Sequence, residues 1–277
     1  MTLLNMVRRN RLFALGLGIC VLWVFFALIA PLIAPYNPLE QDLGARLQKP
    51  GFAHLCGTDS LGRDVLSRVL MGSRISITGS LLTIIFAALV GIVYGGIAGY
   101  IGGVVDELMM RLAELIQAFP TIILAMVIAA ALGPSLFHTL IAMIIVWWPG
   151  FARLMRSAVI QIRSNEFIEA SKSLGASHFR VFFREVLPNS VGSVVVMATV
   201  DFGSAILLFS GLSFLGLGSP PPTPEWGAMV SDGANYLSFW WIATFPGLGI
   251  LTMSIGANFI GDGMRDYLDP KLRKEMG

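Results

Sequence analysis

Few residues in this sequence have the chemistry of an active site, and they lie far apart along the chain. The three histidines, His54, His138 and His178, are scattered, and neither a G-x-S-x-G nor an H-E-x-x-H motif occurs. An enzyme needs a nucleophile with its base, or a set of metal ligands, in one place. The two cysteines, Cys20 and Cys56, match neither a disulfide framework nor a metal-ligand spacing. We therefore expect no catalytic residue, no metal site and no enzyme activity in this chain.

The composition is typical of a membrane protein. Hydrophobic residues make up 55% of the 277 residues and charged residues only 13%, whereas a soluble domain has about 25% charged residues. The formal net charge of +2 is too small to indicate a nucleic-acid partner. The lipid bilayer is the expected surrounding.

Six apolar stretches are predicted to cross the bilayer, giving an all-α bundle, because about 20 apolar residues in a helix span the hydrocarbon core. The first is longer than the apolar part of a typical cleaved signal peptide, which is the alternative for it. The third is long enough only if its helix begins in the turn before Pro120, and Gly-Pro-Ser at 133–135 turns the chain into the fourth. The predicted spans are 12–34, 75–101, 119–132, 136–153, 190–217 and 239–260.

The distribution of Lys and Arg predicts that both termini are cytoplasmic, since these residues gather on the inner side of a membrane. With the N-terminus inside, fourteen of the nineteen fall in cytoplasmic segments, including Arg111 in the connection before the third span. The five exceptions, Arg46, Lys49, Arg63, Arg68 and Arg74, all lie in the loop after the first span. The chain is thus divided into a cytoplasmic segment with the first span (1–34), an extracytoplasmic loop (35–74), a five-span core (75–264) that includes a cytoplasmic loop (154–188), and a cytoplasmic tail (265–277).

Several residues inside the spans indicate how the helices pack. Glycines recur every fourth residue along the second span, which lets another helix approach closely: Gly91, Gly95, Gly99 and Gly103. Asp201 is a carboxylate well inside the fifth span, so it either has a function in a pore or holds a neighbouring helix by a hydrogen bond. Trp147 and Trp148, near the inner end of the fourth span, and Trp240 and Trp241, at the outer start of the sixth, suit interfacial anchors; packing between helices is equally open for the first pair.

The cytoplasmic loop 154–188 is too long for a simple connection and reads as two short helices joined by a glycine. Asn165 is placed to cap the first, with Glu166 and Glu169 near its positive end. Gly175 suits a helix end in the left-handed conformation. We expect Ser177 to cap a second helix over 178–186, Pro188 to stop it, and the fifth span to start anew at Asn189 or Ser190.

This loop also carries apolar side chains that need cover: Phe167, Ile168, Phe179, Phe182 and Phe183. One interpretation is an element held out for a soluble cytoplasmic partner. The alternative is an amphipathic helix resting on the lipid surface.

Here the sequence resembles a known family. Glu169-Ala170-Ser171, with Gly175 six positions after the glutamate and Leu187-Pro188 further on, is similar to the EAA loop of ABC-importer permeases. It departs from the pattern at Ser171, where the second alanine is usual, and at Glu185, where an aliphatic residue is usual. Three further segments resemble the second, C-type permease of the peptide and nickel importers: GTDSLGRDVLSRVLMGSRIS at 57–76, LSFLGLGSPPPTPEWGAMV at 212–230 and GDGMRDYLDPK at 261–271. Phe209 stands where many relatives have an acidic residue, and Asp201 is a candidate for that polar role.

The resemblance implies one half of a heterodimeric pore in the bacterial inner membrane. A homologous B-type permease supplies the other half, two cytoplasmic ATP-binding subunits bind beneath, and an extracytoplasmic binding protein delivers solute. Glu169, Ala170, Ser171 and Gly175 then lie on the coupling helix that docks into an ATPase subunit and transmits its closure. The segment 40–75 and the turn 219–226 are candidate docking surfaces for the binding protein, or lids over the bundle.

The chain contains no G-x-x-x-x-G-K-[ST] phosphate loop, so it is not expected to bind ATP itself and has no cofactor of its own. A self-sufficient channel or secondary transporter is the alternative of another class, but it would be expected to show internal repeats or several intramembrane charges. Peptides are favoured as substrate over nickel or a nickel chelate, because no pair of His or Cys marks a metal route.

Overall fold

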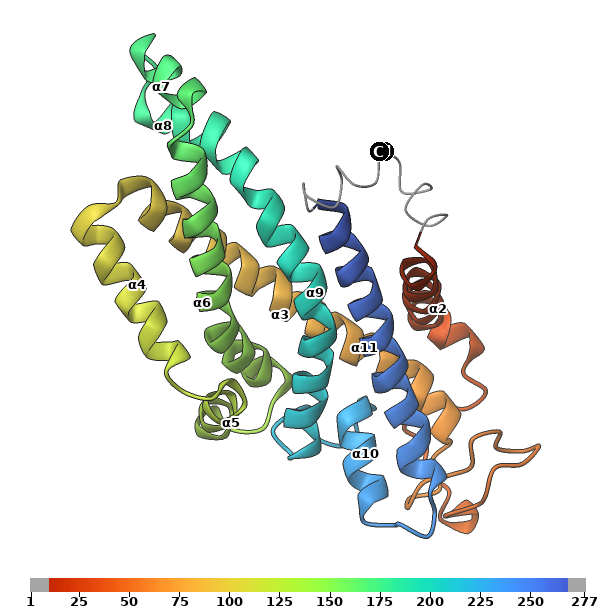
Figure 1. The fold of residues 1–277 in the computed structure, drawn as a ribbon. Coiled ribbons are helices and arrows are strands. Elements are labelled where there is room, and N and C mark those ends of the chain that lie inside the picture. The colour runs from red at the N-terminus through yellow and green to blue at the C-terminus, as the bar shows by residue number, and fades with distance from the viewer. Residues whose placement is uncertain (1–9, 269–277) are drawn as a thin grey trace. The chain divides into compact units, whose positions relative to one another are not determined.

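The computed structural model describes residues 10–268, and helices are the regular elements of this part of the chain (Figure 1). A 3-10 turn, Leu43–Ala45, and a π-helical turn, Phe182–Val186, are the short additions to them. The helices are α2 (Arg11–Ile33), α3 (Val65–Ile101), α4 (Gly103–Gln117), α5 (Thr121–Leu132), α6 (Leu136–Arg163), α7 (Glu166–Ser173), α8 (His178–Val181), α9 (Leu187–Phe214), α10 (Trp226–Ala234) and α11 (Trp241–Leu268).

Among the described residues, five helices are long and apolar enough to cross a membrane, and the number is six if a bent pair of helices is counted as one span. That pair is α4 with α5, whose axes differ by 86°. The expectation that the helix of the third span begins before Pro120 was wrong, because α5 begins at Thr121. A residue before proline is pushed away from helical geometry, so the chain breaks between Gln117 and Thr121. Arg111, expected in a connection, lies on α4 instead.

The predicted spans were shorter than the helices wherever a helix continues into polar residues. Helix α3 begins at Val65 and not at 75, and α6 continues to Arg163, ten residues past the predicted end at Arg153. Polar residues mark where a helix leaves the hydrocarbon, but they do not end the helix. Neither a glycine nor a proline stops it at these points. The segment between α6 and α9 is correspondingly shorter than the predicted loop 154–188. The predicted tail 265–277 lies outside the described residues from 269 onward.

The chain forms two compact units, which are described separately. Unit 1 comprises the described residues of Met1–Leu82, Met126–Ile141 and Thr199–Gly277, and unit 2 comprises Thr83–Ala125 and Ala142–Ala198. In unit 1, α2 packs against α11, and Figure 1 shows the two helices next to each other. A Cβ on Gly16 would lie 2.6 Å from the carbonyl oxygen of Gly256, so the two backbones are in close contact. The indole of Trp23 donates to the hydroxyl of Thr252 at 2.9 Å and fixes the register.

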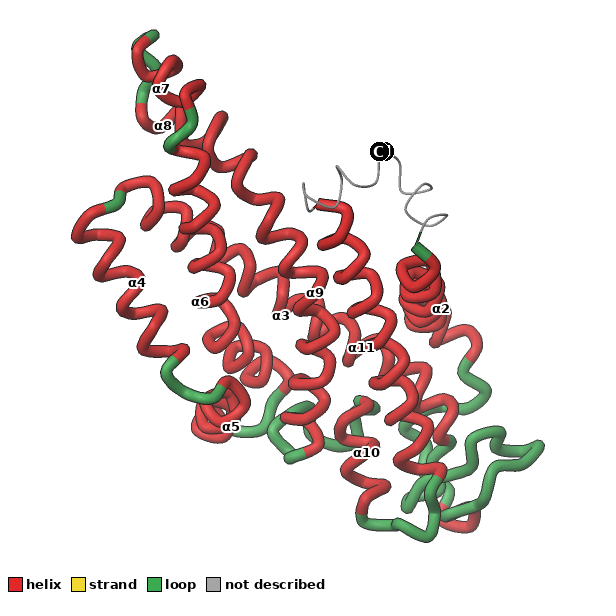
Figure 2. The backbone as a smooth tube through the Cα atoms, viewed as in Figure 1, coloured by secondary structure: helices red, strands yellow, loops and turns green. Residues whose placement is uncertain are grey.

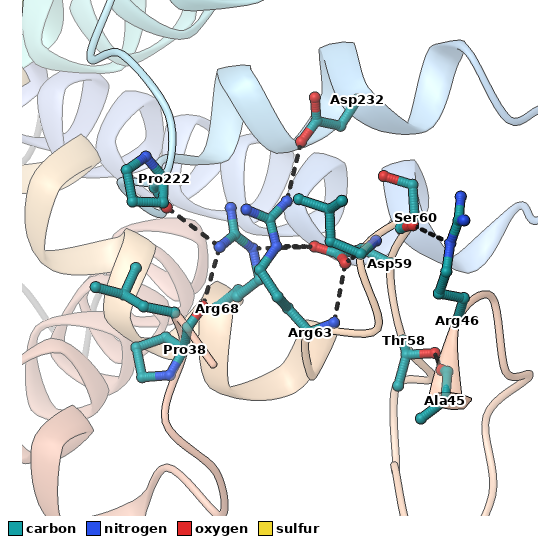
Figure 3. Close-up of polar contacts among 12 residues, drawn as sticks. Pro38, Ala45, Arg46, Thr58, Asp59, Ser60, Arg63, Arg68, Pro222 and Asp232 are labelled. Carbon is teal, nitrogen blue, oxygen red and sulfur yellow. Dashed lines mark hydrogen bonds and ion pairs between the residues drawn. The ribbon is translucent and has the colours of Figure 1, made fainter. Parts of the chain in front are cut away.

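A long loop, 34–64, joins α2 to α3 (Figure 2) and contains a buried charge network. Arg63 donates from Nε to Asp59 at 2.6 Å, and its Nη2 lies 3.5 Å from Asp232 of α10. Arg68 lies 3.5 Å from Asp59 and donates to the carbonyl of Pro222 at 3.3 Å (Figure 3). Burial raises the pKa of Asp232, and the two arginines oppose that rise. Two of the five cations that departed from the charge rule are thus neutralised within the fold.

The Pro-rich turn after α9 leads into the buried start of α10. Glu225 is fully buried and caps α10 by accepting from the N–H groups of Gly227 and Ala228, both at 2.9 Å. Trp226 is also fully buried and donates to the carbonyl of Val69. Trp241 is 6% exposed and donates to the carbonyl of Thr58, so it is a packed side chain and not the predicted interfacial anchor. These contacts make the segment part of the core of unit 1.

In unit 2, the predicted glycine ridge holds α3 against α6. A Cβ on Gly91 would lie 2.4 Å from Cβ of Phe151, and one on Gly95 would lie 2.0 Å from the carbonyl oxygen of Ala152. Gly99 approaches the carbonyl of Arg156 in the same way. Gly103 does not belong to the ridge, because α3 ends at Ile101 and nothing lies within 4 Å of a Cβ there.

The tryptophans of α6 lie in the middle of a long helix and not near its end, since α6 runs on to Arg163. Trp148 is buried, and its ring packs edge-on against Tyr94 with centroids 4.6 Å apart. Packing between helices, one of the two possibilities left open for this pair, is therefore correct for Trp148.

Candidate functional site

The candidate site is the helix–glycine–helix element that joins α6 to α9. Helix α7 begins after Asn165, and its first turn carries Glu166 and Glu169, as expected. The side chain of Asn165 makes no capping hydrogen bond; its backbone carbonyl accepts from Ile168 at 3.0 Å. Glu169 and Ala170 are exposed on α7, where a partner has access to them.

Gly175 ends α7 in the predicted left-handed conformation, with φ of +84°. The N–H of Ala176 donates to Ser171 and that of Gly175 donates to Lys172, which is the Schellman arrangement. Nothing lies within 4 Å of a Cβ built on Gly175, so the backbone conformation, and not space, requires glycine here.

The second half of the element differs from its prediction. Ser177 caps α8 by accepting from the N–H of Arg180, as expected. Pro188, however, does not stop the helix, because α8, the π-helical turn and α9 run as one helix from His178 to Phe214. Leu187 donates to the carbonyl of Phe182, five residues back, which shifts the hydrogen-bond register just before the proline that has no N–H to give.

The two departures from the EAA pattern touch each other. The hydroxyl of Ser171 donates to Oε1 of Glu185 at 2.8 Å, which ties α7 to the π-helical turn. The second carboxylate oxygen of Glu185 is buried and has no hydrogen-bond partner in the described structure. Sequence reasoning treated these positions as two separate changes; their joint departure was the signal that they form a pair.

The apolar side chains of the element divide into a buried and an exposed set. Ile168 and Val181 are fully buried between its helices. Phe179 is 73% exposed and stacks on Phe183, with ring centroids 4.4 Å apart. The exposed set is Phe167, Leu174, Phe179 and Phe183. Phe179 and Phe183 thus form an exposed apolar cluster, and such a cluster on a small folded element is typical of a binding surface.

The element is tied to the end of α3. The hydroxyl of Tyr100 donates to the carbonyl of His178 at 2.9 Å, and its ring packs against Phe182. Arg163, in the last turn of α6, donates to the carbonyl of Tyr100 at 2.6 Å. These contacts join the element to the ends of α3 and α6.

Asp201 lies on α9, where its side chain is half-buried and takes part in a polar or electrostatic interaction. Phe209 is fully buried on the same helix, and a Cβ on Gly79 would lie 2.9 Å from its ring. The position where an acidic residue was expected is thus part of an apolar helix contact in unit 1.

Comparison with known families decides what such an element belongs to. A model described as "Binding-protein-dependent transport system inner membrane component" matches residues 91–274, which includes the whole element. A second, described as "N-terminal TM domain of oligopeptide transport permease C", matches residues 4–50. The chain belongs to the family of binding-protein-dependent transport permeases. It is a permease of the ABC-importer type, as its motifs indicated.

Relatives of this permease are similar over nearly their whole length. It is 43% identical over 268 residues to the dipeptide transport system permease protein DppC of Alkalihalophilus pseudofirmus, covering 96% of this chain and 88% of that one. It is 42% identical over 254 residues to the probable D,D-dipeptide transport system permease protein DdpC of Escherichia coli, covering 91% and 85%. The oligopeptide transport system permease protein OppC of Bacillus subtilis is 39% identical over 268 residues, with 96% and 88% covered.

The fold of this permease is also that of a solved transporter. A chain of the MetNI methionine ABC transporter, in an inward-facing conformation, superposes with a TM-score of 0.58 at 16% identity. The match covers 72% of this permease and 95% of that chain. The predicted all-α membrane bundle is thereby confirmed.

Proposed function

We propose that this permease imports peptides, and that α7 with Gly175 is the coupling helix through which ATPase subunits drive it. Peptides are the substrate named for all three relatives above, and none of those names includes nickel. The observation that carries the coupling role is the exposed apolar cluster on an element that is tied to the ends of α3 and α6. Glu169, Ala170, Ser171 and Gly175 are the residues that we assign to coupling.

The assembly that we propose contains a homologous B-type permease, two cytoplasmic ATP-binding subunits and an extracytoplasmic binding protein. ATP belongs to the partner subunits, and this chain has neither a cofactor nor an enzyme activity of its own. The membrane is the bacterial inner membrane, with both termini in the cytoplasm.

The segment 40–75 and the turn 219–226 are the proposed docking surfaces for the binding protein. Arg63, Arg68 and Glu225 within these segments are buried, but Leu43, Phe52 and Leu55 are exposed. Asp201 remains a candidate pore or helix-contact residue on α9.

The coupling role is tested by co-purification. The chain is co-expressed with its partner permease and ATPases, natively and as Glu169→Lys with Gly175→Pro. Proline cannot adopt the φ of +84° at 175 and loses the hydrogen bond to Lys172, so the end of α7 is disrupted. The ATPases are expected to purify with the native chain and to be lost from the variant, while the two permeases stay together.

Gly192→Ala is the matched control, because nothing lies within 4 Å of a Cβ there and α9 tolerates alanine. Retention of the ATPases by the double variant would contradict the coupling role. The substrate is tested separately in proteoliposomes that contain the assembled importer: uptake of a labelled dipeptide is expected, and uptake of nickel without peptide uptake would contradict the proposal.

A further inference from the structure

Helix α4 presents three different faces. Asp106, Met110 and Ala113 are buried, four and three residues apart, and form the face that packs within unit 2. An exposed apolar face is formed by Val104, Leu108, Leu112 and Leu115. Between them runs a charged stripe of Glu107, Arg111 and Glu114, in which Arg111 lies within 3.8 Å of Glu107 and 3.3 Å of Glu114. A helix wholly in water needs no such apolar face, and a helix wholly in lipid excludes such a stripe.

A hydrogen bond shows how far this stripe lies from the end of α3. The hydroxyl of Tyr94 donates to the carbonyl of Met109 at 2.9 Å, so α4 folds back along α3, a membrane-spanning helix. At 1.5 Å per residue, Met109 is about 9 Å along α4 and Tyr94 about 10 Å before the end of α3. Arg111 and Glu114 lie further along, about 12 and 16 Å from the start of α4. The stripe therefore lies alongside the last turns of α3.

A cavity of about 280 Å³ lies beside the stripe, entirely within unit 2. Its wall includes Gln117 of α4 and two arginines of α6, Arg153 and Arg156. Arg156 binds Asp106 in a bidentate ion pair, at 2.5 and 2.6 Å, which anchors α4 to α6. Arg153 is exposed, contacts the side-chain oxygen of Gln117 and makes no ion pair with any residue in 10–268.

We propose that this cavity is a peptide-binding station on the translocation path, with Arg153 receiving the peptide carboxylate and the glutamates of the charged stripe receiving its ammonium group. Charges beside a membrane-spanning helix must face water or protein, since exposure to lipid is costly. An arginine binds a carboxylate through two parallel hydrogen bonds, which suits the free end of a peptide. The inference rests on the proposed function in taking a peptide as the cargo.

Two adjacent positions provide the first test. Glu114→Cys lies on the charged stripe, and Leu115→Cys lies one residue on, on the apolar face. In the assembled importer, a charged thiol reagent is expected to modify Glu114→Cys about ten-fold faster, because a thiol that faces lipid is not ionised. The native chain supplies the background: Cys20 is buried, and burial together with Asp64 raises the pKa of the Cys56 thiol to about 11. Peptide-loaded binding protein with ATP is expected to slow the modification of Glu114→Cys.

The second test addresses the carboxylate site. Arg153→Gln is expected to raise the KM for dipeptide uptake about ten-fold, the effect of losing a charge-assisted hydrogen bond. Arg153→Lys keeps the charge and is expected to restore most of the affinity. Arg265→Gln, an exposed arginine near the end of α11, is the control and is expected to leave KM unchanged.

The possible failures are distinguishable. If the native importer takes up peptide but Glu114→Cys is unreactive, the stripe is covered by the partner permease and the inference is wrong while the proposed function stands. If Glu114→Cys is modified and protected but Arg153→Gln has a normal KM, the role of Arg153 is wrong. If the native importer takes up no peptide, the proposed function itself fails.

Discussion

The loop 34–64 and the coupling element, residues 166–186, are both rich in charge, and they differ in whether they bury a network of paired charges. In the loop and the start of α3, Asp59, Arg63 and Arg68 are each 3% exposed and paired with one another or with backbone carbonyls. In the coupling element, Glu169, Arg180 and Arg184 are exposed, and so are large apolar side chains beside them.

The difference distinguishes charges that stabilise the fold from charges that are available to a partner. Buried charges are costly unless they are matched in place, so the loop network is satisfied within this chain. The coupling element leaves charged and apolar groups uncovered, although it is folded by two helix caps and a buried pair of aliphatic residues. Such a surface is completed by another protein.

The largest expected effect is on the buried network. Arg63→Ala leaves Asp59 buried with only part of its hydrogen bonds, which we expect to cost about 3–5 kcal/mol of unfolding free energy. Arg184→Ala, on the exposed coupling element, is expected to change stability by no more than about 0.5 kcal/mol. Thermal unfolding of the purified permease pair in detergent measures both, and equal losses would remove the distinction between the two regions.

Substitution in the exposed cluster is expected to weaken ATPase binding and to leave stability unchanged. Phe179→Ala removes an exposed aromatic ring, so the melting temperature of the permease pair should stay within error. Binding of the ATPase subunits is expected to weaken by about 2 kcal/mol if Phe179 is an interface anchor. Titration of ATPase onto the permease pair measures this, and unchanged affinity would mean that the cluster rests on lipid.

A backbone substitution sharpens the same comparison. Gly175→Ala is expected to cost about 1–2 kcal/mol locally, because an alanine at φ of +84° is strained. Gly192→Ala, equally open in space but helical, is expected to cost nothing. ATPase co-purification should fall for the first variant only; a matching fall for both would show that the left-handed conformation is unimportant.

The smallest effect concerns the Ser171–Glu185 pair. Ser171→Ala is expected to lose about 1 kcal/mol of coupling between α7 and the π-helical turn, by removing a hydrogen bond to a carboxylate. The double variant Ser171→Ala with Glu185→Leu restores the usual family pattern and should recover most of the loss. Peptide transported per ATP hydrolysed is the readout, since a merely structural pair would change stability and not this ratio.

Much of the coupling element could be predicted because its signals are local. A left-handed glycine, a serine cap and acids in a first turn each depend on a few neighbouring residues. The end of the second helix could not be predicted in this way. Pro188 is a stop signal by itself, but the π-helical turn before it shifts the hydrogen-bond register, and the helix continues past a residue that has no N–H.

The sequence by itself determined the class of protein, the approximate positions of the spans and the family, because hydropathy and motif spacing are properties of the linear chain. Tertiary structure alone decided which charges are buried and which remain exposed. It paired Arg63 with Asp232, 169 residues away, and Ser171 with Glu185, and it brought Arg153 of α6 to Gln117 of α4. These outcomes depend on contacts between distant segments, and the free energy of a charge is set by the groups that surround it in the folded chain.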